Sequence, residues 1–286
     1  MEIYPIHIEN FKIDGGVMFG VVPKVLWKKV YPADDENLCN WALRSLLIVD
    51  GNRKILIDNG FGDKQSAKFF SHFHLNGGKG LKGALAEYGY KPEDITDMVL
   101  THLHYDHCGG GLRYNSDRTA LELVFPNATY WISRSQWNWA INPNKREADS
   151  FLSENLLYMQ ESGHLKFIEK NGMLFPDFEV RIYDGHTKGQ VVPFIHFNGK
   201  TIVFVADLLP SVAHIPLPYI ASYDVEPMKT LKEKEDFLNE AFENNYVLFF
   251  EHDLYNECCN LKCEPKGIKV KDTFLLKDFL SGAGKV

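Results

Sequence analysis

The stretch VLTHLHYDHCGG, residues 99–110, places three histidines and one aspartate within six consecutive positions. Alternate side chains of an extended segment face the same way, so we expect His102 and His104 on one side of the chain. After the extended part the backbone turns, and Asp106 and His107 can then point to a neighbouring spot. Imidazole nitrogens and carboxylate oxygens are the donors that zinc binds. The pattern therefore predicts two pairs of ligands separated by about one metal–metal spacing.

More ligands must come from elsewhere in the chain, because a zinc ion takes about four donors. Later candidates follow apolar runs, in the segments YDGHTKG, TIVFVADLLP and VLFFEHD. Strand ends along one edge of a sheet converge on one rim, where functional sites are commonly built. The sequence predicts that this rim gathers seven metal ligands: His102, His104, Asp106, His107, His186, Asp207 and His252.

The elements around these motifs alternate between strands and helices. Apolar runs at 43–49 and 54–57 flank Asp50-Gly51 and predict a β-hairpin. A short buried strand is expected at 97–101, and amphipathic helices at 80–90 and 226–245. Strand groups with interleaved helices favour two packed sheets with helices outside. We find no repeat and no linker, so residues 1–286 are interpreted as a single domain.

The composition is that of a globular protein, with 45% hydrophobic and 24% charged residues. The formal net charge of -7 disfavours a nucleic-acid partner. No apolar run reaches the about 18 residues of a membrane span, and the N-terminus does not read as a signal peptide. Five cysteines in a chain of 286 residues do not suggest a disulfide framework. These features predict a cytoplasmic protein that acts on a small molecule and contacts neither nucleic acid nor membrane.

Four segments carry a resemblance to a known family. The sequences THLHYDHCGG, YDGHTKGQ, FVADLLP and FFEHD resemble, in this order, the successive metal-binding motifs of the metallo-β-lactamase superfamily. LIDNG, residues 56–60, resembles the family's early aspartate motif. The resemblance covers roughly residues 40–255 and implies the α/β fold of that family. This fold is an αββα sandwich of two packed mixed β-sheets, with a binuclear metal site at one edge.

The resemblance also implies a role for each ligand. The first metal would be held by His102, His104 and His186, and the second by Asp106, His107 and His252. Asp207 would bridge the two metals, and Asp58 would orient a ligand. We expect two divalent ions, zinc first, with manganese or iron as alternatives.

Two such cations lower the pKa of a shared water from 15.7 toward roughly 7, which gives hydroxide at neutral pH. The expected function is a binuclear metal-dependent hydrolase that uses this bridging hydroxide on a small ester, lactone or phosphotriester. Asp106 and Asp207 are the candidate catalytic residues. The segments 11–29 and 207–227 resemble lactonase-like and organophosphate-hydrolase-like members. Pro210 stands where acyl-homoserine lactonases carry a tyrosine that positions substrate.

Other interpretations stay open at this point. The same fold could serve a phosphodiesterase or nuclease, or a metal-stabilised binding protein without turnover. Exposed apolar segments could pair two copies into a homodimer. Segment 18–27 is either a core strand or an apolar wall over the site, and the roles of His214 and Tyr223 are undecided.

Overall fold

A computed structural model of the chain describes residues 1–282. The described chain divides into two compact units that alternate along the sequence. The first unit comprises Met1–Asn10, Leu43–Lys170 and Gly189–Val191, and the second comprises Phe11–Ala42, Asn171–Lys188 and the chain from Val192 onward. The interpretation of residues 1–286 as one domain stays a prediction, and its last four residues, 283–286, lie outside the described range.

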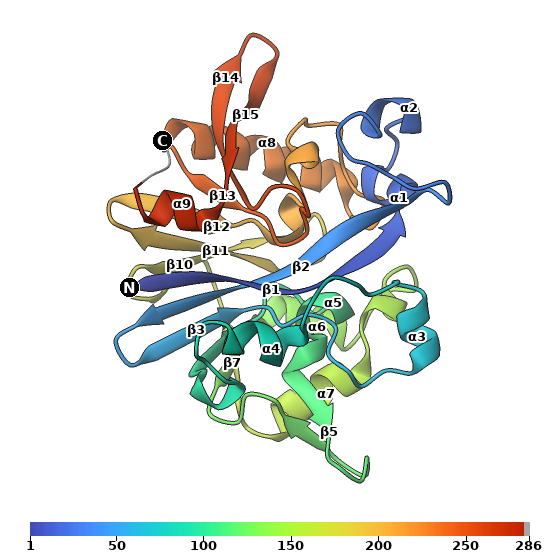
Figure 1. Cartoon of the computed structure of the whole chain (residues 1–286), viewed down its shortest axis with the longest axis vertical. Helices are drawn as coiled ribbons and strands as arrows, with labels where there is room; N and C mark the ends of the chain where they lie inside the picture. Colours follow the sequence, from blue (N-terminus) through green and yellow to red (C-terminus); the bar gives the residue numbers. More distant parts are fainter. Residues whose placement is uncertain (283–286) are drawn as a thin grey trace. The chain divides into compact units, whose positions relative to one another are not determined.

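The sheet of the first unit has six strands in the order β1-β2-β3-β4-β7-β8. The strands are β1 (Glu2–Asp14), β2 (Leu38–Asp50), β3 (Arg53–Ile57), β4 (Asp97–Val99), β7 (Thr129–Ser133) and β8 (Leu165–Ile168). Figure 1 shows β1 and β2 as long neighbouring strands in blue, each of which continues into the second unit. The predicted hairpin is confirmed, because Asp50 pairs with Arg53 across a turn in which Gly51 has a φ of 57°.

Strands β3, β4, β7 and β8 run parallel, so β4 lies between two parallel neighbours and its residues are buried. The helices of this unit are short: α3 (Ala67–Ser71), α4 (Gly80–Ala86), α5 (Tyr105–Cys108), α6 (Arg134–Ala140) and α7 (Ser153–Glu161). A small hairpin joins β5 (Leu112–Tyr114) to β6 (Leu121–Leu123), and three single 3₁₀ turns are η1 (Pro92–Asp94), η2 (Gly109–Gly111) and η3 (Ala148–Ser150).

The sheet of the second unit has seven strands in the order β15-β14-β13-β12-β11-β10-β9. They are β9 (Gly172–Phe175), β10 (Phe178–Tyr183), β11 (Gln190–Phe197), β12 (Lys200–Phe204), β13 (Val247–Phe249), β14 (Cys258–Glu264) and β15 (Gly267–Phe274). Figure 1 shows β14 and β15 as a long hairpin in red. Strands β12 and β13 are parallel with Phe204 opposite Phe249, so the residues that follow them leave the same edge of the sheet.

Helix α8 (Pro227–Glu243) confirms the predicted amphipathic helix. Its apolar side chains Phe237, Leu238 and Ala241 join a buried cluster with residues of the sheet, among them Phe194 and Leu248. The other helical elements of this unit are α1 (Gly15–Phe19), α2 (Lys24–Trp27), α9 (Leu276–Leu280), η4 (Ala206–Leu208) and η5 (Val212–His214). No helix within residues 1–282 is both long enough and apolar enough to cross a membrane.

The core-strand interpretation of segment 18–27 is wrong. This segment lies in α1 and α2. Asp14 caps α1: its Oδ1 accepts hydrogen bonds from the backbone N–H groups of Gly16 and Val17, at 2.7 and 3.2 Å, while Pro23 precedes α2. The rings of Phe19 and Trp27 are buried and stacked with centroids 5.1 Å apart. Between these anchors the chain turns outward, and Val21 at the turn is 93% exposed.

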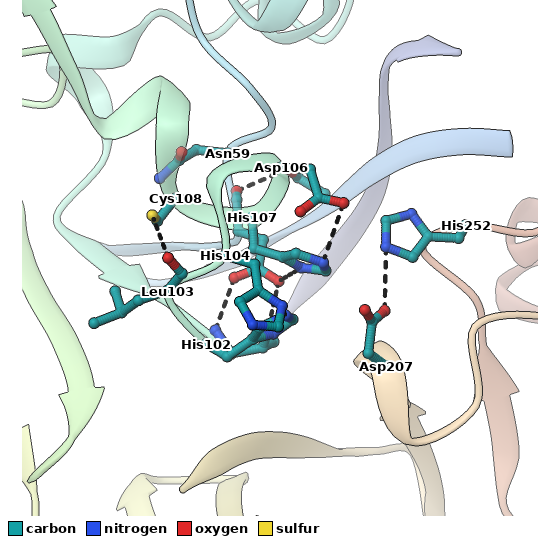
Figure 2. A network of polar contacts seen from close by, with 12 residues as sticks. Asn59, His102, Leu103, His104, Asp106, His107, Cys108, Asp207 and His252 are labelled. Carbon is teal, nitrogen blue, oxygen red and sulfur yellow. Dashed lines mark hydrogen bonds and ion pairs between the residues drawn. The ribbon is translucent and has the colours of Figure 1, made fainter. Parts of the chain in front are cut away.

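All five cysteines are free thiols. Cys39, Cys108, Cys258 and Cys259 are buried, whereas Cys263 near the end of β14 is exposed. Burial raises the pKa values of the Cys39 and Cys108 thiols to about 12. The Cys108 thiol donates a hydrogen bond of 3.3 Å to the carbonyl oxygen of Leu103 (Figure 2). A buried thiol that stays protonated acts as a small packing group.

Candidate metal centre

The first unit brings together the four ligand candidates that follow β4. His102 Nε2 lies 3.1 Å from His104 Nδ1, and the ring centroids of His102 and His107 are 3.9 Å apart. Asp106 Oδ2 lies 3.7 Å from His107 Nε2 (Figure 2). Helix α5 begins directly after His104, whose extended backbone serves as the N-cap, and this turn carries Asp106 and His107 back toward the strand end. The structure therefore brings these four side chains together after β4, and their role as metal ligands stays a prediction.

Each of these three histidines uses its other nitrogen on an outer partner. His107 Nδ1 lies 3.0 Å from Asp58 Oδ2, as the resemblance implied. His102 Nδ1 lies 3.0 Å from Thr101 Oγ1, and that hydroxyl donates to Asp58 Oδ2 at 2.6 Å. Because the threonine hydrogen is committed to the carboxylate, its oxygen accepts the Nδ1–H of His102. His104 Nε2 lies 2.9 Å from Glu147 Oε1.

Asp58 is held firmly enough to orient these groups. It is fully buried, and its Oδ1 accepts the backbone N–H of Thr101 at 2.7 Å. Its own backbone has a φ of 56°, a left-handed conformation that an aspartate adopts only when its surroundings impose it. Ser45 contributes by donating its hydroxyl to the Asp58 carbonyl at 2.7 Å. The strained turn after β3 thus directs the carboxylate at Thr101 and His107.

The second unit brings together the other three candidates. Asp207 and His252 follow the parallel strands β12 and β13, and Asp207 Oδ1 lies 3.1 Å from His252 Nε2 (Figure 2). Asp207 Oδ2 lies 3.2 Å from His186 Nε2. One carboxylate therefore faces two imidazoles, one with each oxygen. Ala206, just before it, has a φ of 46°, so the turn that places Asp207 is also strained.

These two histidines also carry outer partners. His186 Nδ1 lies 2.9 Å from Asp224 Oδ1, and the backbone N–H of Val225 donates to the His186 carbonyl at 3.0 Å. His252 Nδ1 donates to the carbonyl of Ala42 at 3.0 Å, and the Ala42 N–H donates back to the His252 carbonyl at 2.9 Å. Gly185 precedes His186 where a Cβ would lie against Thr230. Both imidazoles are buried and fixed in orientation.

The hydrogen-bond pattern makes these side chains fit a divalent cation. In a neutral imidazole whose one nitrogen donates outward, the other nitrogen is an unprotonated lone pair. In the first unit such lone pairs face each other at His102 and His104, and in the second they face the oxygens of Asp207. Lone pairs at this separation repel unless a cation lies between them. Outer partners of this kind orient histidine ligands in metal sites generally.

Sequence reasoning missed several of the outer partners. Glu147 and Asp224 are 43 and 38 residues from the histidines that they contact. Neither lies in a recognisable motif, so no local signal marks it. The carbonyl of Ala42 is a backbone group that no residue pattern identifies. Thr101 directly precedes His102 in the quoted stretch. Among these missed partners, its hydroxyl is the one that lies within the motif and could have been found from the sequence.

His214 is a buried structural residue of the second unit. Its Nε2 lies 2.8 Å from the Met18 carbonyl oxygen, its Nδ1 lies 2.8 Å from Ser211 Oγ, and its ring stacks on Phe19 with centroids 4.8 Å apart. These contacts tie α1 to the segment that follows Asp207. Tyr223, the other undecided residue, is 40% exposed.

Burial lowers the pKa of His214 from 6.5 to about 3, and this predicts a pH effect on stability. Below pH 6.5 the His214 side chain is protonated in the unfolded chain and stays neutral in the folded chain. The contribution of His214 to the free energy of unfolding therefore falls as the pH drops from 6.5 toward 3. Between pH 7.5 and pH 5 we expect His214 to account for about 2 kcal/mol of lost stability. Urea unfolding of the wild type and of His214→Gln at both pH values measures this loss of stability. His72→Gln, at an exposed histidine, is the control. An equal loss in the wild type and His214→Gln would contradict the prediction.

The chain is similar to known proteins in sequence and in fold. The sequence profile described as the metallo-beta-lactamase superfamily matches residues 44–252. A solved structure described as a probable metal-dependent hydrolase from Staphylococcus aureus aligns with a TM-score of 0.86 at 28% identity, covering 96% of this chain and 98% of that chain. The structure of AidC, a dizinc quorum-quenching lactonase, aligns with a TM-score of 0.77 at 22% identity, covering 96% of this chain and 95% of that chain.

A curated relative is an N-acyl homoserine lactonase from Bacillus cereus, 25% identical over 180 residues. The match covers 60% of this chain and 62% of the lactonase, so the chain spans less than two thirds of the length of the curated relatives it matches. The profile match extends over more than half of the chain and contains all seven predicted ligands, and the predicted fold class is confirmed. The chain therefore belongs to the metallo-beta-lactamase superfamily.

Proposed function

We propose that the protein is a metal-dependent hydrolase whose seven predicted ligands form one binuclear site. The observation that carries the proposal is the commitment of one nitrogen of every candidate histidine to an outer partner. Each of the five candidate histidines has one ring nitrogen in contact with an outer partner. An incidental cluster of surface histidines would not require these partners. Membership of the family supports joining the two groups, since the matched region includes both of them. We likewise propose that the two units act as a single domain.

In this proposal the division of the ligands follows the family motifs. His102, His104 and His186 would hold the first metal, and Asp106, His107 and His252 would hold the second. Asp207 would be shared between them, which accords with its two oxygens facing two different histidines. Zinc is the proposed metal, because the donors are imidazole and carboxylate and because AidC is described as a dizinc enzyme.

A bound metal pair supplies hydroxide at neutral pH and a Lewis acid for the carbonyl or phosphoryl oxygen of a substrate. The protein residues supply the rest. Asp58, Glu147 and Asp224 keep three imidazoles in the tautomer that binds a metal. Asp106 and Asp207 are the carboxylates that we propose to hold or move a proton at the reacting centre. This division of labour needs no nucleophilic side chain.

The proposed substrate class is a small ester or lactone, with phosphotriesters as a further candidate. The relatives named as N-acyl homoserine lactonases favour lactones. Pro210 lacks the hydroxyl that a tyrosine at this position would offer to a substrate. We therefore expect hydrolysis of lactones in which the metals and the pocket walls, rather than residue 210, position the ring. A homodimer stays a prediction.

Metal analysis combined with a substrate panel tests the function. We expect about two zinc ions per chain, and metal-dependent hydrolysis that is fastest for N-hexanoyl homoserine lactone and slower for p-nitrophenyl acetate and paraoxon. Chelation should remove the activity, and added zinc should restore it. Full activity after chelation would refute the proposal. Faster cleavage of bis(p-nitrophenyl) phosphate would favour the phosphodiesterase alternative, and tightly bound metal without any turnover would favour a binding protein.

A further inference from the structure

One of the five candidate histidines is oriented differently from the other four. His102, His107, His186 and His252 each use Nδ1 for the outer partner, which leaves Nε2 for a metal. His104 uses Nε2 for Glu147 and presents Nδ1, the nitrogen nearer to its own backbone. We propose that Glu147 is a positioning residue that sets this reversed orientation and thereby completes the first metal position. The inference rests on the proposed function.

The carboxylate of Glu147 is itself fixed by several donors. The residue is 4% exposed, and its Oε2 accepts hydrogen bonds from Trp139 Nε1 at 2.7 Å and from Asn144 Nδ2 at 3.3 Å. The backbone N–H of Glu147 donates to Asn144 Oδ1 at 3.1 Å. A side chain with both ends of its carboxylate engaged cannot follow the imidazole if that ring rotates. Its Oε1 therefore acts as a fixed acceptor for the Nε2–H of His104.

The reversed orientation needs such an acceptor. An imidazole ring that loses its outer partner can turn over, and either of its nitrogens can carry the proton. Phe151 packs against His104 with ring centroids 5.0 Å apart at 45°, and this contact restricts the ring without distinguishing its nitrogens. A fixed negative charge beside Nε2 keeps the proton there and makes Nδ1 the basic nitrogen. Glu147 thus selects which nitrogen the metal meets.

The segment that carries Glu147 contacts His104 at two points. Trp139 lies on α6, while Asn144, Glu147 and Phe151 follow it within twelve residues. The stretch from α6 to Phe151 therefore contacts His104 twice, once through a charge and once through a ring. A change in this stretch would therefore reach the proposed first metal position through the two contacts with His104.

Metal titration and ¹⁵N spectra of histidine-labelled protein test the proposal. In Glu147→Leu we expect the zinc affinity of the first position to fall about 10–100-fold in chelator competition. In the metal-free protein, the ¹⁵N signals of His104 should change from a single Nε2–H tautomer to a mixture. Glu147→Gln keeps an acceptor oxygen, so it should keep the tautomer and lose less affinity. Asp149→Asn, an exposed carboxylate of the same segment, is the control and should match the wild type.

The outcomes separate this inference from the function on which it rests. If His104→Ala loses zinc while Glu147→Leu binds it as the wild type does, Glu147 has no positioning role and the proposed function stands. Zinc binding that survives His104→Ala, His102→Ala and His107→Ala overturns both. An unchanged His104 tautomer in folded Glu147→Leu also overturns the inference, because a merely structural role would alter stability and leave the tautomer as it was.

Discussion

Replacement of Asp207 by alanine lowers kcat/KM for the best panel substrate about 1,000-fold or more, equivalent to about 4 kcal/mol of transition-state stabilisation. The two oxygens of Asp207 each face a histidine, His252 and His186, at 3.1 and 3.2 Å. Without this carboxylate, two cations in the proposed site would repel each other across an unbridged gap. Metal content should fall together with turnover. Steady-state kinetics and elemental analysis of the same preparation measure both.

Two further variants sharpen that experiment. Asp207→Asn keeps the shape of the side chain and removes its charge, so it distinguishes loss of the bridge from loss of packing. Asp236→Ala removes an exposed carboxylate on α8 that pairs with Lys232, and it should leave activity and metal content unchanged. An Asp207→Asn protein that keeps two metals and most of its turnover would exclude a bridging role for Asp207.

The second large effect concerns stability, at Lys234 on α8. The side chain is almost fully buried, and its Nζ donates to the carbonyl oxygens of Pro216, Leu217 and Tyr219 at 2.8, 3.3 and 2.8 Å. Burial lowers the pKa of this amine from 10.5 to about 7. Lys234→Met fills a similar volume and leaves the three carbonyls without their donor. Because a buried acceptor that loses its partner costs about 1–3 kcal/mol, we expect unfolding to become easier by about 3 kcal/mol or more.

Denaturant unfolding followed by circular dichroism measures the change at Lys234. Lys232→Met is the matched control, since this lysine is on the same helix, is exposed and pairs only across one turn with Asp236. We expect the control to change stability by less than about 0.5 kcal/mol. A Lys234→Met protein as stable as the control would mean that the segment 216–219 does not depend on the lysine.

Much of the candidate site was predictable because its ligands follow strands. His102, Asp207 and His252 each come after a run of apolar residues, and parallel strands such as β12 and β13 deliver their next residues to one edge. The hairpin at Asp50-Gly51 was equally predictable, because the residues that favour its turn lie in the turn itself. In each case the deciding physical signal lies within about ten residues of the element that it specifies.

The remaining features were not readable because they depend on partners distant in sequence. Glu147 and Asp224 are ordinary acidic residues until the fold places them beside His104 and His186. Lys234 looks like one of several lysines on the solvent face of an amphipathic helix, yet it is buried against a loop 15 to 18 residues earlier. Segment 18–27 is apolar enough for a strand, yet it follows a helix capped by Asp14 and continues into a second helix after Pro23.

The unequal burial of the five thiols has a practical use. A maleimide dye or spin label reacts with thiolate at an accessible sulfur, and Cys263 is the exposed cysteine of the chain. The other four are enclosed, so the native protein should take up one label, at the tip region of the β14–β15 hairpin, without any cysteine being removed. The same position offers a tether for attaching the protein to a surface through a single defined point.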